Sequence, residues 1–113
     1  MSFYKSHRQE PHFSNVKEGK KVIEVRLRKG KYAEVKAGDI FEVQRPDESE
    51  SFRVKVVGTT YYNSFKKMAE NENFKEIIPE AKDVSDVVKA CREFYSEEQE
   101  KEFGVVALRV KVL

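Results

Sequence analysis

The sequence predicts a single α+β domain, in which about five to six strands form a mixed, partly closed β-barrel with flanking helices. Its 113 residues suffice for one hydrophobic core and no linker divides them, so we expect residues 1–113 to form one domain. Strands and helices do not alternate along the chain, which excludes a doubly wound parallel sheet. The last strand must return to a sheet made earlier, and closing that sheet into a barrel would remove exposed edges.

The composition is that of a folded domain. Hydrophobic residues make up 39% of the chain and aromatic residues 12%, which argues against disorder despite 37% charged residues. No run of about 18 apolar residues is present, and the first ten residues lack the apolar core of a secretory signal. Cys91 is the single cysteine, which excludes an internal disulfide, and we expect it to be a small buried side chain. We therefore expect a cytoplasmic monomer with no metal, no other cofactor and no membrane partner.

The first half of the chain contains the predicted barrel strands. A short strand can open at residues 3–5, and a helical turn follows that begins at Pro11 and ends at Gly19. From residue 21 to residue 28 the period is two, which predicts a strand with one apolar face and one largely charged face. Two further strands are predicted at residues 40–45 and 52–61, joined by a polar hairpin loop at residues 46–51.

Helical spacing takes over in the second half. Ser64 and Asp83 are suited to cap helices, and residues 74–78 form a short apolar turn between them. We expect the apolar positions of the helix after Asp83 to lie in the core; they are Val84, Val87, Val88, Cys91, Phe94 and Tyr95. A charged helical turn at residues 96–102 then leads to a final strand at residues 105–112.

The net charge of +2 conceals two segments of opposite sign. Residues 17–36 hold eight basic and three acidic residues, whereas residues 66–102 hold seven basic and eleven acidic ones. Such a division suits an anionic ligand on one side of the molecule, although two solvated faces would look the same. The glutamates after Ser96 are interpreted as a solvated helix face; they are Glu97, Glu98, Glu100 and Glu102.

The stretch from Gly19 to Arg28 is the most informative one. Lysine is a compact charge suited to phosphate, and arginine grips phosphate or a base edge with two parallel bonds. Glutamate can accept from the exocyclic amine of a base or hold the cations in place. We therefore name five ligand-binding candidates here, with an exposed, charge-paired strand face as the other interpretation: Lys20, Lys21, Glu24, Arg26 and Arg28.

Aromatic residues follow the strand at residues 52–61. Tyr61, Tyr62 and Ser64 are further ligand-binding candidates, because aromatic rings beside a basic groove stack on bases. We expect one of the two tyrosines to face the ligand and Phe65 to be buried.

The pattern Gly-x-Lys-x-x-Glu-x-Arg, at Gly19, Lys21, Glu24 and Arg26, resembles the signature of the ASCH domain family. Three further blocks resemble that family in the same order along the chain: residues 37–41, 62–65 and 103–108. The resemblance implies a fold related to the RNA-binding PUA domain, with a cleft beside the strand that carries Lys, Glu and Arg. It also implies recognition of RNA or of a nucleotide.

Some members of this family resemble an amidohydrolase that removes the acetyl group of N4-acetylcytidine with a Lys, a Thr three residues later and a Glu. Carried over, this set falls on Lys21, Glu24 and Glu72, which are the catalytic candidates if the protein is an enzyme. The threonine hydroxyl is missing, and a carboxylate at position 24 does not replace it as a nucleophile. His7 and His12 precede the motif and are interpreted as surface or structural residues.

The leading hypothesis is a domain that binds RNA, a nucleoside or a nucleotide in a basic cleft. Two alternatives stay open, a nucleoside amidohydrolase and a protein-interaction or regulatory module.

Overall fold

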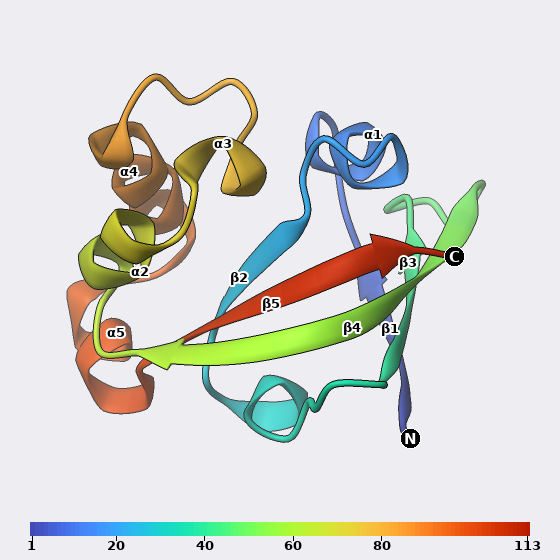
Figure 1. Cartoon of the computed structure of the whole chain (residues 1–113), viewed down its shortest axis with the longest axis horizontal. Coiled ribbons are helices and arrows are strands. Elements are labelled where there is room, and N and C mark those ends of the chain that lie inside the picture. Colours follow the sequence, from blue (N-terminus) through green and yellow to red (C-terminus); the bar gives the residue numbers. More distant parts are fainter.

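The computed structural model describes all 113 residues and contains one mixed five-stranded sheet of order β1-β3-β4-β5-β2. β1 pairs parallel with β3, and the other neighbouring strands are antiparallel. The sheet curls into a half-barrel whose two edge strands, β1 and β2, do not pair with each other (Figure 1). This confirms the predicted α+β, partly closed barrel. The strands are β1 (Phe3–His7), β2 (Ile23–Leu27), β3 (Ile40–Gln44), β4 (Ser51–Tyr62) and β5 (Val105–Val112).

Five α-helices flank the half-barrel, and four of them form a group at one end of β4 and β5 (Figure 1). Ser64, Asp83 and Ser96 each accept a backbone N–H in the first turn of α2, α4 and α5, as expected of these side chains at an N-cap. None of the helices is long and apolar enough to cross a membrane. The helices are α1 (His12–Lys17), α2 (Phe65–Asn71), α3 (Phe74–Ile77), α4 (Val84–Phe94) and α5 (Glu97–Phe103), and a 3-10 turn spans Gly30–Ala33.

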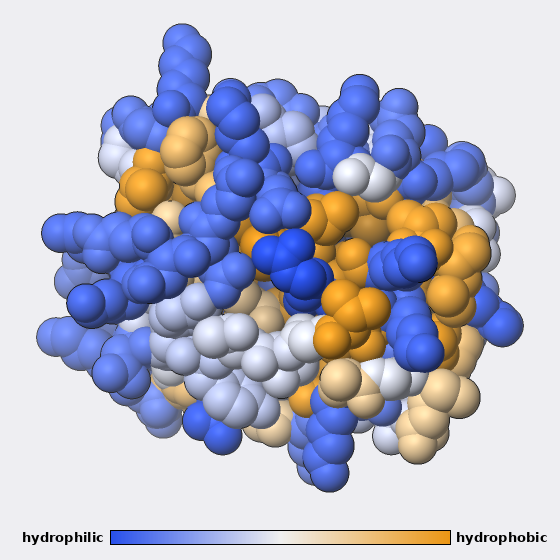
Figure 2. Space-filling model, in the orientation of Figure 1, coloured by the Kyte–Doolittle hydropathy of each residue, from blue (hydrophilic) through white to orange (hydrophobic).

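Two hydrophobic cores meet at the sheet. One lies inside the half-barrel and contains Phe13, Phe41 and Leu108, while the other packs β2 and β5 against the helices through Phe65, Met68 and Val87. The hydrophilic residues in Figure 2 dominate the surface over the helices, and apolar residues gather on the other half of that face. Strand β5 contributes to both cores because its two faces point to different layers.

The sequence left open an exposed, charge-paired face for β2, and the structure excludes that interpretation for Glu24 and Arg26. Glu24 and Arg26 keep only 13% and 14% of their side-chain surface in contact with water. They point to the concave side of the sheet, where the half-barrel closes over them. A periodic pattern predicts which residues share a face, but only the curl of the sheet decides whether that face is exposed to solvent.

Two further expectations on burial are wrong. Glu100 is 8% exposed rather than part of a solvated face; it accepts the Phe65 N–H (2.6 Å) and an N–H of Arg92 (2.8 Å). Phe94 is 59% exposed rather than in the core, because α4 ends there at the open side of the half-barrel.

Candidate functional site

A cavity of about 270 Å³ runs along the free edge of β2. The end of β1 and the start of α1 form one wall, α3 and α4 form another, and β2 lies between them. The wall carries Arg8, Lys21 and Arg26 but no Asp or Glu side chain. Segments that are far apart in the sequence therefore meet at one concave site, which is half apolar and carries cationic but no anionic side chains.

The backbone at the free edge of β2 has unpaired groups. The Val22 carbonyl accepts from Val110 and the Arg28 N–H donates to Gly104, so even-numbered residues of β2 pair with β5. The N–H and C=O groups of odd-numbered residues then point toward the open edge. Val25 is the odd-numbered residue on the cavity wall; its carbonyl accepts from Arg26, and the register directs its N–H toward this edge.

Lys21 is held by the turn that precedes β2. Gly19 adopts a φ of 78°, which reverses the chain after α1, and the Asn15 carbonyl accepts the N–H groups of both Lys20 and Lys21 at 2.9 Å. The Lys21 ammonium is buried, with the residue 6% exposed, and it donates to the Ile77 carbonyl. Burial lowers the pKa of Lys21 to about 8, despite the opposing effects of Cys91 and Glu80.

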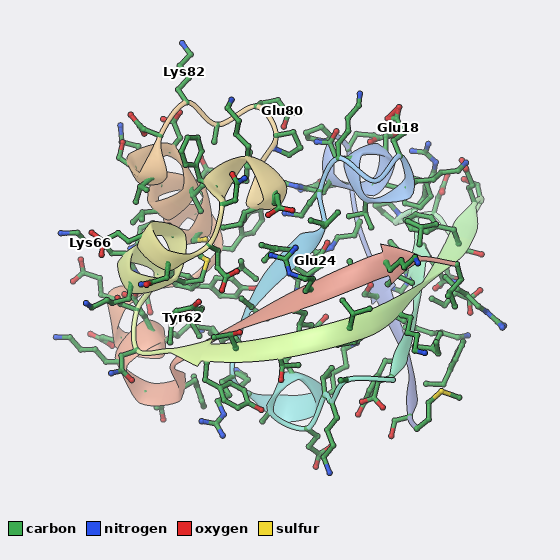
Figure 3. The ribbon with its side chains drawn as sticks, viewed as in Figure 1. Glu18, Glu24, Tyr62, Lys66, Glu80 and Lys82 are labelled. Atoms are coloured by element: carbon green, nitrogen blue, oxygen red, sulfur yellow. The ribbon has the colours of Figure 1, made fainter.

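Glu24 organises two arginines from the barrel side. Arg8 donates to its carboxylate, and Nη1 of Arg26 lies 3.4 Å from it. Arg26 also donates to the Val25 carbonyl at 2.8 Å, which bends its side chain around the edge of β2 toward the cavity. Glu24 itself does not line the cavity; it lies on β2 near the middle of the molecule (Figure 3). Its position is that of a residue that orients the two guanidinium groups.

Both histidines lie on the cavity wall, whereas the sequence analysis had placed neither of them at the site. Burial and the nearby Lys21 charge lower the pKa of His12, and Glu80 opposes this, so His12 is neutral at pH 7. Nothing in the local sequence indicates this placement. It arises because β1 pairs parallel with β3 and so carries His7 and the following α1 across the open side of the barrel.

The helical wall supplies an apolar and aromatic surface. Tyr95 stacks on Phe65, with ring centroids 5.7 Å apart, and the exposed Phe94 follows on the rim. Cys91 also faces the cavity, and burial raises the pKa of its thiol to about 11, so it is protonated at neutral pH. A protonated thiol is a poor nucleophile. This wall is therefore suited to packing against a flat ring rather than to covalent chemistry.

Five ligand-binding candidates lie away from this cavity. Exposed Lys20 has its ammonium 3.9 Å from Glu18, and Ser64 is occupied as the cap of α2. The Arg28 guanidinium lies 3.8 Å from the centroid of the Tyr61 ring, at a separate hollow beside Gly104 that Tyr62 also lines. Figure 3 shows Tyr62 at the α2 end of β4. The structure thus brings together Lys21 and Arg26, with Glu24 behind them, but not the remaining candidates.

Glu72 belongs to another cluster. It accepts from the Tyr62 hydroxyl and lies 3.8 Å from Arg109, and it does not line the cavity. Burial and the Glu72 carboxylate raise the pKa of Tyr62 to about 12. No group of three or more His, Cys, Asp or Glu side chains is arranged to hold a metal ion.

A half-barrel of this topology with a helical group at one end defines the class of PUA-like α+β domains, a fold consistent with RNA binding. The family model described as "ASCH domain" matches residues 7–113, and this chain belongs to the ASCH domain family.

Solved structures share this fold. The crystal structure of the hypothetical protein PH0355 is 37% identical, covers 100% of both chains and has a TM-score of 0.86. The solution structure of protein PF0455 from Pyrococcus furiosus is 33% identical over 100% of this chain and 98% of that one, with a TM-score of 0.77. An ASCH domain from Lactobacillus crispatus shares the fold at 17% identity, with a TM-score of 0.70 over 98% and 79% of the two chains. No curated protein matches the chain.

Proposed function

We propose that this domain binds RNA or a nucleoside by holding one nucleobase in the cavity beside β2. One observation carries the proposal: three cationic side chains and the aromatic end of α4 face a single concave site with no carboxylate on its wall. The volume of about 270 Å³ lies just below the usual range for small-molecule pockets, roughly 300–1,000 Å³. Such a site suits one base taken out of a strand, and it is too small for a duplex.

The polar groups on the wall are mostly donors. Lys21 has three N–H donors and uses one on Ile77, and the Val25 N–H points to the open edge. A base with carbonyl acceptors therefore fits this wall better than one that presents an amine. Uracil, with two carbonyl oxygens, is the base we expect to bind best, and Tyr95 offers the apolar surface for its face.

Amide hydrolysis is less well supported by the geometry. A lysine with a pKa of about 8 can act as a general base, but it needs a hydroxyl or a water to activate. Position 24 carries a carboxylate that is engaged with Arg8 and Arg26 on the barrel side, and Glu72 is bonded to Tyr62. We therefore propose binding without hydrolysis of the ligand.

Matched variants test this proposal. Uridine and N4-acetylcytidine are titrated by NMR and calorimetry into the wild type, Lys21→Met and Arg26→Met, with Lys20→Ala and Arg28→Ala as neighbours outside the cavity. Hydrogen bonds from charged groups contribute about 1.5–3 kcal/mol, so the two cavity variants should bind uridine roughly 10- to 150-fold more weakly. The two control variants should bind as the wild type does, and N4-acetylcytidine should remain intact.

Several results would contradict the proposal. If no nucleoside shifts the resonances of Lys21, Val25 or Tyr95, or if Lys20→Ala weakens binding as much as Lys21→Met, the cavity is not the site. Turnover of N4-acetylcytidine that disappears in Lys21→Met would favour the hydrolase instead. Circular dichroism of each variant separates lost binding from lost folding.

A further inference from the structure

A second groove adjoins the cavity. It lies between the 3-10 turn after β2 and the end of α4, and it shares Arg26, Phe94 and Tyr95 with the cavity. The two hollows therefore lie side by side, with these three side chains between them.

The groove is cationic on its own. Lys29, Lys31 and Arg26 line it, and no Asp or Glu does. Lys31 donates to the Lys5 carbonyl of β1 at 2.5 Å, and its ammonium lies 5.4 Å from the centroid of the Tyr32 ring, which also lines the groove. The Lys29 ammonium lies 4.9 Å from the centroid of the Phe103 ring, which lines the hollow beside Gly104. Both lysines therefore start on the groove wall, and their flexible side chains place an ammonium group at its margins.

The acidic start of α5 does not close this groove. Among the residues of α5, Gln99 alone lines it, while Glu100 points inward to Phe65 and Arg92. The positive charge of the groove is therefore not cancelled by a carboxylate on the same wall.

Phe94 stands on the ridge between the two hollows. Its side chain is 59% exposed, which is unusual for a phenylalanine at the end of an amphipathic helix. Its ring lies 6.4 Å from that of Tyr95, at an interplanar angle of 54°, so the two rings present differently oriented faces to the solvent. A base stacked on Phe94 would lie beside a base held in the cavity.

We infer that the groove carries the sugar–phosphate backbone of single-stranded RNA along Lys29 and Lys31, with Phe94 stacking the base next to the one in the cavity. This inference rests on the proposed function and extends it, because it makes a strand rather than a free nucleoside the preferred ligand. It also assigns separate roles: the cavity reads one base, and the groove adds affinity that depends on chain length and salt.

The test compares uridine with a six-residue single-stranded oligouridylate on the same proteins. The variants are Phe94→Ala and the double variant Lys29→Ala/Lys31→Ala. The control is Lys66→Ala/Lys67→Ala, which removes the same charge from exposed positions of α2, outside both hollows. Figure 3 labels Lys66 on that helix. Affinities are measured by fluorescence anisotropy or calorimetry between about 50 and 200 mM salt, the range over which counterion release is large.

We expect the oligouridylate to bind the wild type more tightly than uridine. The Lys29→Ala/Lys31→Ala variant should flatten the slope of log K against log salt by about 1.4, since each phosphate contact on a single strand contributes about 0.7. Phe94→Ala should weaken the oligouridylate roughly 5- to 150-fold, the effect of losing one stacked base. Uridine affinity should hardly change in the double variant, and the Lys66→Ala/Lys67→Ala control should behave as the wild type.

Oligouridylate affinity equal to that of uridine would overturn the inference. The inference would also be overturned if Lys66→Ala/Lys67→Ala lost as much oligouridylate affinity as Lys29→Ala/Lys31→Ala. A double-stranded RNA that binds more tightly than the single strand would also overturn it. Each of these results leaves uridine binding in the cavity, and therefore the proposed function, intact. If the wild type does not bind uridine at all, the proposed function itself is wrong.

Discussion

At the scale of single residues, the buried charge of Lys21 lowers the stability of the fold and also offers hydrogen-bond donors to a ligand. The side chain is 6% exposed, its charge has no close carboxylate partner, and the Ile77 carbonyl is its one hydrogen-bond acceptor. Burying a charge without a paired counter-charge costs stability, which is why its pKa falls to about 8. The Lys21 ammonium therefore has N–H donors that a bound ligand can satisfy better than the protein does without a ligand.

The pKa of Lys21 predicts a pH dependence of stability. Between pH 8 and 10.5 the folded state binds fewer protons at Lys21 than the unfolded state does, so the free energy of unfolding should rise with pH across this window. The full contribution is about 3 kcal/mol, at about 1.4 kcal/mol for each pH unit. Urea unfolding of the wild type and of Lys21→Met, measured from pH 7 to 10.5, checks this through the difference between the two curves.

The raised pKa values of Cys91 and Tyr62 act in the opposite direction above pH 9. Lys21 does not act on Tyr62, so the effect of Tyr62 cancels in that difference. Lys21 does lower the pKa of Cys91, so both proteins are compared in a Cys91→Ala background, which removes the thiol. Parallel curves for the wild type and Lys21→Met would show that Lys21 titrates as a solvated lysine, contrary to the prediction.

At the scale of elements, α5 is joined to its neighbours by one buried carboxylate. Glu100 accepts the N–H of Phe65 at the start of α2 and an N–H of Arg92 on α4, so three helices share its two oxygens. The neighbouring Glu102 is exposed and forms no such bond. Both residues are glutamates, but Glu100 is buried and bonded whereas Glu102 is exposed. A count of charges along the chain cannot distinguish these two roles.

Glu100→Ala should therefore destabilise the fold, and Glu102→Ala should not. Removing the carboxylate leaves a buried N–H and a guanidinium without their acceptor, a loss of about 2–4 kcal/mol. An exposed substitution of this kind changes stability by less than about 0.5 kcal/mol. Chemical denaturation of both variants is the measurement, and equal stabilities would refute the assigned role of Glu100.

At the scale of the whole molecule, the cavity lies where two layers meet. The half-barrel supplies β2 and the end of β1, and the helical group supplies α3 and α4, so a bound guest contacts elements of both layers and the margin of the core beneath the helices. Local openings that separate α4 from the barrel would expose such a guest. Ligand binding should therefore oppose those openings more than it opposes openings elsewhere.

Hydrogen exchange tests this arrangement. With uridine at 100 times its Kd, amides of α4 that exchange by local opening should slow about 100-fold, the factor expected when only the closed form binds. Amides of the β3–β4 hairpin loop, which lies outside the cavity wall apart from Pro46, should exchange at unchanged rates. Protection of the hairpin without protection of α4 would locate the ligand somewhere else.

The sequence by itself determined the elements and the family. Alternation with period two placed the strands, Ser64 and Asp83 marked helix starts, and the Gly-x-Lys-x-x-Glu-x-Arg pattern indicated an ASCH domain. These features are local, since they depend on spacing and on the hydrogen bonds that one side chain makes to its own neighbours.

The tertiary structure alone decided which residues share the candidate site. The parallel pairing of β1 with β3 brought Arg8 and His12 opposite Lys21, and the curl of the sheet buried Glu24 and left Tyr62 at a different end. Such juxtapositions depend on contacts between residues far apart in the chain, which no periodicity along the sequence encodes. For that reason the strand that carries the motif could be predicted, whereas the residues that face it from other elements could not.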